Sequence, residues 1–409
     1  MKVEEDCHAV VPPDVVPPDV VPDLQSVINS GLITNPVLLR VELQIFQIRY
    51  KVFHKKFTFV KIAIIILKLL LMKKTIFILI YFLCIPFYIL AQETQEKIVL
   101  AYITSGNKVM PDPNYVTHVN YAFGTVKSTF DGVNVQNPER LKEIVKLKEQ
   151  KPSLKILLSI GGWGAGGFSE MACEDNLRAA FVKDCKKIAD EFNLDGIDMD
   201  WEYPSSRGPG ITAQPEDIDN FTKLMKELRE ILGKDKLVTF ATSARARYYD
   251  FSAVMPYCDF VNIMAYDLGR PPRHNASLYP SSMTRFSAKD AIDAHIEAGV
   301  APNQLVLGVP FYGHGNRSKG FPDYVDYSAI SKGDYDKYTH KWDEDGKVPY
   351  IVDEEGDMIV TYDSPESLKL KCDYALERGL LGVMYWEYSC DDPQLTLTKA
   401  TYEAVNPKK

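Results

Sequence analysis

Eight short apolar segments recur along the chain from about residue 97 onward, and their regular spacing constrains the fold more than any other feature. The segments are Ile98–Thr104, His118–Phe123, Lys155–Gly161, Gly196–Glu202, Leu237–Ser243, Phe260–Tyr266, Leu305–Tyr312 and Gly382–Trp386. Most are near-continuous apolar runs, which is typical of parallel strands covered on both faces. Between them lie segments such as 174–192 and 215–232, whose apolar residues recur at helical spacing. Eight strands with interleaved helices predict an α/β fold, a single (β/α)8 TIM barrel.

Signals between these segments favour the barrel over an open sheet. Asn137 and Ser364 are each followed by proline and predict two capped helix starts. An open doubly wound sheet would carry a glycine-rich phosphate-binding loop after its first strand, and residues 102–106 do not form one. The longest gap, residues 313–381, predicts an elaborated loop that contains a hairpin at 350–362.

The first 91 residues carry signals of processing rather than of folding. Residues 10–23 form a proline-rich repeat that cannot build a packed core. Residues 72–91 read as a methionine and two lysines, an apolar run and a final alanine, which is the pattern of a secretory signal. We therefore predict that residues 1–71 are an upstream extension that is not normally made and that 72–91 are a signal peptide. The mature protein, 92–409, would be exported to the periplasm, the cell exterior or the cell surface.

A membrane anchor over residues 59–90 is the competing interpretation. This stretch exceeds the ~20 apolar residues that a transmembrane helix needs. Lysines lie within it, and each costs about 2.5–3.5 kcal/mol at the centre of a bilayer. In either case the chain would meet a membrane only through this N-terminal segment.

Charge and cysteine content exclude several classes of function. The formal net charge is -8, from 55 acidic and 47 basic residues, and nucleic acid binding requires a basic surface instead. A neutral polymer is compatible with this charge. The seven cysteines include no C-x-x-C pair and no Cys/His cluster with zinc spacing, so we predict no metal site and no cofactor. The five cysteines after residue 91 are an odd number, and we interpret them as isolated buried thiols.

The fourth predicted strand is the most informative segment for function. Side chains alternate along a strand, so Asp198, Asp200 and Glu202 share one face and the apolar residues between them share the other. In a barrel the apolar face suits the surrounding helices. The three carboxylates then point inward and rise towards the C-terminal end of the barrel, where active sites of this fold lie. Asp195 has the opposite parity and is interpreted as structural.

Three acids at alternate positions raise one another's pKa values, so at least one should keep its proton near neutral pH. A protonated carboxyl group is what a departing oxygen atom needs. Glu202 is the outermost of the three and is the candidate proton donor. Asp200 can share or pass a proton, and Asp198 can hold Asp200 in place.

The segment Asp195-Gly196-Ile197-Asp198-Met199-Asp200-Trp201-Glu202 resembles the D-x-x-D-x-D-x-E signature of glycoside hydrolase family 18, the chitinases. Three other motifs match that family in order. Residues 159–163 resemble its S-x-G-G motif on strand three, 264–267 its M-x-Y-D motif closing strand six, and 385–387 the end of strand eight. The resemblance covers nearly everything from about residue 97 to 400.

The resemblance implies a hydrolase that cleaves β-1,4-linked N-acetylglucosamine in chitin and chito-oligosaccharides. Such enzymes retain the anomeric configuration by substrate assistance, because the acetamide oxygen of the sugar acts as nucleophile. Glu202 would then protonate the leaving oxygen, Asp200 would orient the N-acetyl group, and Tyr266 would hydrogen-bond its carbonyl. The implied substrate-binding residues are Trp386, Asp267, Met264, Tyr121, Phe123 and Trp163.

One departure and two alternative functions follow from the same resemblance. Many family members carry an α+β insertion between strands seven and eight, but Gly313 and Trp342 are close in sequence, so we expect a short or absent insertion. A chitin-binding lectin without activity is one alternative, although such proteins usually lack the terminal glutamate of the signature. An endo-β-N-acetylglucosaminidase that removes N-glycans is the other, and it would use the same strand chemistry.

Overall fold

Eight parallel strands form a closed barrel in the computed structural model, which describes residues 96–407. The barrel strands are β1 (Ile98–Thr104), β2 (His118–Val126), β4 (Lys155–Gly161), β5 (Gly196–Asp200), β6 (Leu237–Ser243), β7 (Phe260–Met264), β8 (Leu305–Pro310) and β14 (Gly382–Trp386). The sheet closes because β1 pairs in parallel with both β14 and β2. The predicted (β/α)8 barrel is therefore confirmed. Strands β5 and β7 end two residues earlier than predicted, so Glu202 and Tyr266 lie just beyond their strands.

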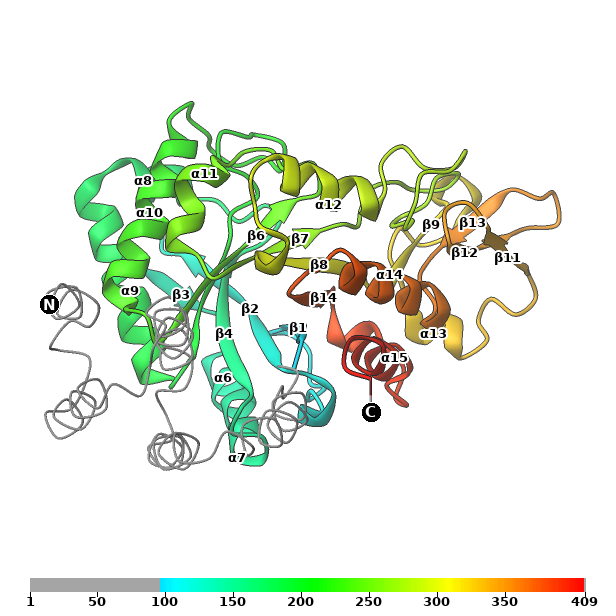
Figure 1. Ribbon diagram of the computed structural model, residues 1–409, viewed down its shortest axis with the longest axis horizontal. Coiled ribbons are helices and arrows are strands. Elements are labelled where there is room, and N and C mark those ends of the chain that lie inside the picture. Colours follow the sequence, from blue (N-terminus) through cyan, green and yellow to red (C-terminus); the bar gives the residue numbers. More distant parts are fainter. Residues whose placement is uncertain (1–95, 408–409) are drawn as a thin grey trace, which may run out of the picture. The chain divides into compact units, whose positions relative to one another are not determined.

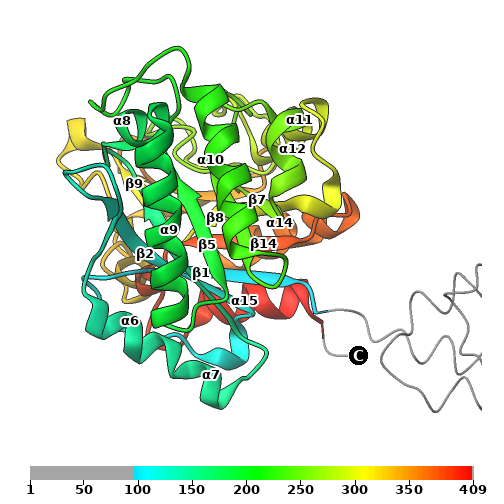
Figure 2. The same ribbon diagram turned by 90° about the vertical axis from the view of Figure 1, so that its left-hand side faces the viewer.

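Helices follow the strands and cover the outside of the barrel (Figures 1 and 2). They are α6 (Pro138–Val145), α7 (Leu147–Gln150), α8 (Phe168–Cys173), α9 (Asp175–Glu191), α10 (Asp217–Leu232), α11 (Phe251–Val254), α12 (Ala288–Glu297), α14 (Pro365–Glu377) and α15 (Thr396–Val405). Both predicted caps are present, because Asn137 accepts a hydrogen bond from the amide of Arg140 and Ser364 accepts one from that of Ser367. Short strand β3 (Val133–Val135) pairs antiparallel with the end of β2.

Strand register decides which side chains enter the barrel. Asp198 on β5 lies opposite Ser159 on β4 and Thr239 on β6, and partners in neighbouring strands point to the same face. The residues between the acids point outward into the main core. Trp201 is fully buried there and stacks on Phe168 of α8 with ring centroids 5.3 Å apart. Because the apolar residues of this segment face the outer helices, the carboxylates at the alternate positions point into the barrel.

A small antiparallel sheet is inserted between barrel strands β8 and β14 and projects from one side of the barrel (Figure 1). Its elements are β9 (Tyr312–Gly315), β10 (Val325–Asp326), α13 (Tyr327–Ser331), β11 (Thr339–Asp343), β12 (Val348–Val352) and β13 (Met358–Thr361). The insertion has its own apolar cluster around Ile351, Ile359 and Val360. The sequence predicted that this insertion is short or absent, and the structure shows that it is present and short. The predicted hairpin is confirmed as β12–β13.

The predicted extension at 1–71 and the predicted signal peptide at 72–91 lie outside the described residues. Residues from 96 onward form one compact unit. No helix within 96–407 combines the length and the apolar character that crossing a bilayer requires. In the same range Cys185, Cys258, Cys372 and Cys390 are buried, Cys173 is partly exposed, and none of these five thiols is paired with another.

Candidate active site

Three carboxyl groups rise along one strand to the C-terminal end of the barrel. Asp198 and Asp200 lie on β5, and Glu202 follows its last residue. Their exposed fractions increase from 0% for Asp198 through 3% for Asp200 to 9% for Glu202. Glu202 is therefore the member nearest to solvent, and any substrate that approaches from this end reaches it first.

Asp198 is held at the bottom of this row by four donors from four other strands. Its carboxylate accepts hydrogen bonds from Tyr102 (2.8 Å), Ser159 (2.8 Å), Thr239 (2.6 Å) and Asn262 (3.1 Å). Burial raises the pKa of Asp198, and these hydrogen bonds oppose the rise by stabilising the ionised form. The arrangement favours a fixed carboxylate beneath Asp200.

Sequence reasoning did not identify these four donors, although each carries a signal. Each is an inward-facing polar residue in an otherwise apolar strand segment, as with Asn262 in Phe-Val-Asn-Ile-Met. A buried polar side chain needs a hydrogen-bonding partner. If side-chain alternation had been applied to every strand and not only to β5, it would have predicted that all four side chains face the barrel interior, where Asp198 lies.

Asp200 lies between the two other acids and is almost completely buried. This burial raises its pKa well above the usual range, and the charges of Glu202 and Asp198 raise it further. Its Oδ1 atom has no hydrogen-bond partner among the described residues. The backbone of β4 approaches closely here, because a Cβ atom on Gly161 would lie 2.0 Å from the carbonyl oxygen of Asp200. Asp200 is thus a buried acid with a raised pKa and a free Oδ1 atom next to Glu202.

Burial raises the pKa of Glu202 to about 7, and the nearby carboxylate of Asp267 contributes in the same direction. The side chain of Tyr203 partly opposes this shift. Near neutral pH a large fraction of Glu202 therefore keeps its proton, but the main causes are burial and Asp267 and not the like charges along the strand on which the sequence prediction rested. A carboxyl group poised close to the working pH is suited to both proton donation and proton uptake.

Tyr266 lies two residues beyond the end of β7 and completes the cluster around the acids. Its ring is buried, and burial and the charges of Asp200 and Glu202 raise the pKa of its hydroxyl well above 10. Gly308 on β8 makes room for it, since a Cβ atom there would lie 3.0 Å from the ring. The hydroxyl lies 3.9 Å from Met384 Sδ and keeps its proton, so it is available as a donor.

Asp267 is fixed by contacts that the sequence did not reveal. Its backbone is left-handed, with φ of 56°, and its amide donates to Asn275 Oδ1 at 2.8 Å. Its carboxylate accepts from His314 Nε2 at 2.5 Å. Burial alone would raise the pKa of Asp267, but the hydrogen bond and charge of His314 bring it below the usual range. Asp267 therefore stays ionised with about half of its side chain (52%) exposed.

Trp386 and Phe123 form an aromatic pair at the same end of the barrel. Trp386 is the last residue of β14, and its ring stacks on that of Phe123 with centroids 5.6 Å apart and planes 21° from parallel. The register between β2 and β4 shifts between Ala122 and Gly124, which turns Phe123 away from the outer face. Gly162 leaves space for that ring, since a Cβ atom there would lie 2.7 Å from it.

The three remaining residues that the sequence predicted to bind substrate lie in different places. Met264 is the last residue of β7 and shares the inward parity of Tyr266. Trp163 follows β4 and is 68% exposed, so it contributes a free aromatic surface. Tyr121 does not join the site. It lies opposite Leu158 on the outer face of the barrel, and its hydroxyl donates to the carbonyl groups of Gln136 and Asn137.

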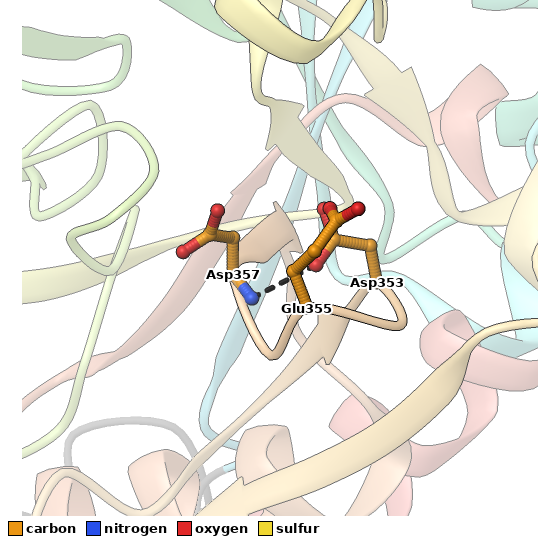
Figure 3. Close-up of side chains that lie close together, drawn as sticks. All are labelled: Asp353, Glu355 and Asp357. Atoms are coloured by element: carbon orange, nitrogen blue, oxygen red, sulfur yellow. Dashed lines mark hydrogen bonds between the residues drawn. The ribbon is translucent and has the colours of Figure 1, made fainter.

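Asp353, Glu355 and Asp357 form an acidic group in the β12–β13 turn, away from the site (Figure 3). The ammonium group of Lys319 lies 2.8, 2.9 and 2.6 Å from their carboxylates. The amide of Asp357 also donates to Asp353 at 2.9 Å. Lys319 thus pairs with all three carboxylates, and a backbone amide binds one of them. We interpret this group as stabilising the turn.

Comparison with known proteins identifies a family for most of the chain. Residues 87–391 match the family described as "Glycosyl hydrolases family 18". Chitinase A1 of Niallia circulans is 31% identical over 345 residues, which cover 72% of this chain and 48% of that protein. Probable chitinase 2 of Drosophila melanogaster is 31% identical over 368 residues, 75% of each chain. This chain thus spans about half the length of the first relative and three quarters of the second.

Solved structures show the same similarity. A glycoside hydrolase family 18 N-acetylglucosaminidase from Paenibacillus barengoltzii superposes with a TM-score of 0.68 at 32% identity, covering 75% of this chain and 99% of that one. The Group IV chitinase of Ostrinia furnacalis in complex with allosamidin gives a TM-score of 0.67 at 30% identity, covering 76% and 97%. Both solved relatives therefore share the (β/α)8 barrel fold of this chain.

Proposed function

The chain belongs to glycosyl hydrolase family 18, and on this premise we propose that it hydrolyses the β-1,4 bonds of N-acetylglucosamine polymers such as chitin. The observation that carries the proposal is the position of Glu202, whose pKa burial raises to about 7, next to the buried Asp200 at the C-terminal end of the barrel. Relatives described as chitinases share this barrel over about three quarters of the chain, which supports the same substrate class.

Glu202 acts as the acid and then as the base of this reaction. In the first step its proton passes to the glycosidic oxygen while the acetamide oxygen of the same sugar attacks the anomeric carbon. The leaving portion departs as an alcohol, and a cyclic oxazolinium ion remains. In the second step the Glu202 carboxylate takes a proton from water, which opens the ring with net retention. Each step returns Glu202 to the protonation state that the next step needs.

Asp200 and Tyr266 position the acetamide group for this attack. The free Oδ1 atom of Asp200 is available to the acetamide N–H, and ionisation of Asp200 would offset the positive charge that develops on the ring. Asp198, which its four donors hold in place, assists the ionisation of Asp200 by sharing its proton. Tyr266 keeps its hydroxyl proton and donates it to the acetamide oxygen.

The aromatic pair supplies the surface on which the reacting sugar rests. Trp386 presents a flat ring beside Phe123 at the end of β14, and flat rings suit the C–H faces of pyranoses. Met264 and Asp267 close the side of the site next to Tyr266. The exposed ring of Trp163 offers a further contact for a longer chain.

The pH dependence of turnover follows from the state of Glu202. We expect kcat/KM to fall about tenfold per pH unit once the pH rises above about 7, because only the protonated acid can assist the departing oxygen. The measurement is kcat/KM from pH 4 to 9 on a chito-oligosaccharide. A rate that continues to rise through pH 9 would contradict the assignment of Glu202 as the acid.

The direct test of function is the product pattern from a defined N-acetylglucosamine hexamer. We expect shorter oligomers whose newly formed ends have the β configuration, as a retaining mechanism requires. Tight binding of the hexamer without cleavage would instead indicate a lectin. Removal of N-glycans from a glycoprotein, with the hexamer left intact, would indicate an endo-β-N-acetylglucosaminidase.

A further inference from the structure

Three consecutive loops at the C-terminal end of the barrel are unusually basic for this chain. They follow β5 (residues 203–216), β6 (residues 244–250) and β7 (residues 265–287). Together with Trp201 and Glu202, which also follow β5, they contain six arginines and no lysine, against four acidic residues, Glu202, Glu216, Asp250 and Asp267. The whole chain has the opposite sign, with a formal net charge of -8. These loops at the C-terminal end of the barrel therefore carry a local excess of basic over acidic residues.

Five of these arginines lack an acidic partner among the described residues. Only Arg270 is paired, with Asp323 at 2.8 Å. The five others, here called the arginine rim, are Arg207, Arg245, Arg247, Arg273 and Arg285. Four of them are exposed, and Arg273 is partly exposed.

Two of the acids in these loops are engaged elsewhere, whereas Glu216 is exposed. Asp250 bonds Ser252 and the amide of Ala253, where it caps α11. Asp267 is bound by His314. The guanidinium group of Arg245 instead lies 4.1 Å from the ring centroid of Phe286, so a residue of the third loop holds an arginine of the second. This contact connects the loops that follow β6 and β7, and it fixes the position of Arg245.

The arginine rim does not serve to neutralise the buried acids. The main influences on the pKa values of Asp198, Asp200 and Glu202 are burial, one another and the groups that contact them directly. No rim arginine is among these influences. The rim charge is therefore available to a molecule that binds from solvent.

The position of the rim indicates which part of a substrate it would meet. The reacting sugar rests on Trp386 and Phe123, which come from β14 and β2. The rim follows β5, β6 and β7, which lie together in another arc of the barrel that includes Glu202 and Tyr266. Since Glu202 protonates the oxygen of the leaving portion, that portion extends from Glu202 towards the rim loops.

We propose that the arginine rim binds carboxylate groups on the leaving portion of the substrate, so that N-acetylglucosamine chains with an acidic reducing-end side are preferred over neutral ones. This inference rests on the proposed function. Planar guanidinium groups match carboxylates through paired hydrogen bonds, which compact ammonium groups cannot provide. A rim built from arginine without lysine fits that chemistry.

The test compares two probes of equal length that differ only at the reducing end. One is an N-acetylglucosamine pentamer oxidised there to an aldonic acid, and the other is the same pentamer reduced to an alditol. We expect kcat/KM to be roughly 5- to 20-fold higher for the acid, as one or two charged hydrogen bonds would give. In 0.5 M salt the preference should shrink, because exposed charges are screened.

Variants separate the rim from general charge effects. The triple variant Arg245→Gln, Arg247→Gln and Arg285→Gln should cleave the two probes with equal kcat/KM. Arg317→Gln, which removes an exposed arginine of the insertion, should keep the wild-type preference. Equal cleavage of the two probes by the wild-type protein would overturn the proposal, as would a preference that survives the triple variant.

Binding measurements keep this proposal distinct from the proposed function. Calorimetry with the full-length Glu202→Gln variant gives the affinity for both probes whether or not they are cleaved. Tighter binding of the acid, lost in the rim variant, supports the rim even if the wild type cleaves neither probe, in which case the proposed function alone fails. Equal affinities for acid and alditol would refute the rim.

Discussion

Replacement of Glu202 by glutamine should reduce kcat on chito-oligosaccharides by about 10³-fold while substrate binding is retained. Glutamine keeps the size of the side chain but has no acidic proton to give. General acid–base catalysis contributes roughly 10²–10⁴-fold to such reactions, and here one group serves both steps. The measurement is single-turnover cleavage of the hexamer, with the dissociation constant determined separately by calorimetry.

Glu387 provides a matched control for this variant. It is a buried glutamate just beyond the end of β14, its pKa is also raised by burial, and its side chain binds Ser389. Glu387→Gln therefore tests the loss of a buried acid at the same end of the barrel. We expect this variant to keep at least about a tenth of the activity. Similar losses in both variants, or full turnover by Glu202→Gln, would contradict the assignment.

Replacement of Asp200 by asparagine should lower kcat by about 10²–10³-fold, with little effect on the folded structure. Asparagine fits the buried site but cannot become negative when positive charge develops on the sugar, and such electrostatic stabilisation is worth that much in comparable sites. If Asp200 acts through the acetamide, affinity for a thiazoline analogue of the oxazolinium ion should fall by a similar factor. Affinity for a plain oligosaccharide should change less.

The control is an Asp→Asn change on the same strand outside the site. Asp195 points the other way, pairs with Lys148 at 2.8 Å and accepts from the amide of Ile156 at 2.9 Å. Asp195→Asn should cost some stability, seen as a lower Tm, but should leave thiazoline affinity intact. If Asp200→Asn binds thiazoline as tightly as the wild type, Asp200 does not act on the acetamide.

Alternation of side chains predicted the main lines of the fold and of the site. The apolar runs placed all eight barrel strands, four of them with the bounds that the structure has. On β5 the same rule placed Trp201 against the helices and the acids inside. These features could be predicted because they depend on local periodicity, which a single sequence displays.

Features that depend on contacts between distant segments could not be predicted in this way. Tyr121 and Phe123 are two residues apart, yet a shift in strand register sends one outward and the other onto Trp386. Asn275, eight residues further along the same loop, and His314 on β9 hold Asp267 in place. The sequence left open whether the insertion is short or absent, because its strands are short and its own core is small.

The central claim is that Glu202, buried at the C-terminal end of the barrel, keeps a proton near neutral pH. Carbon-13 NMR of protein labelled at glutamate carboxyl groups measures this directly. The account predicts one resonance that titrates near pH 7, is lost in Glu202→Gln and persists in Glu387→Gln. A spectrum in which the resonance assigned to Glu202 titrates near the usual value of about 4.3 would contradict it.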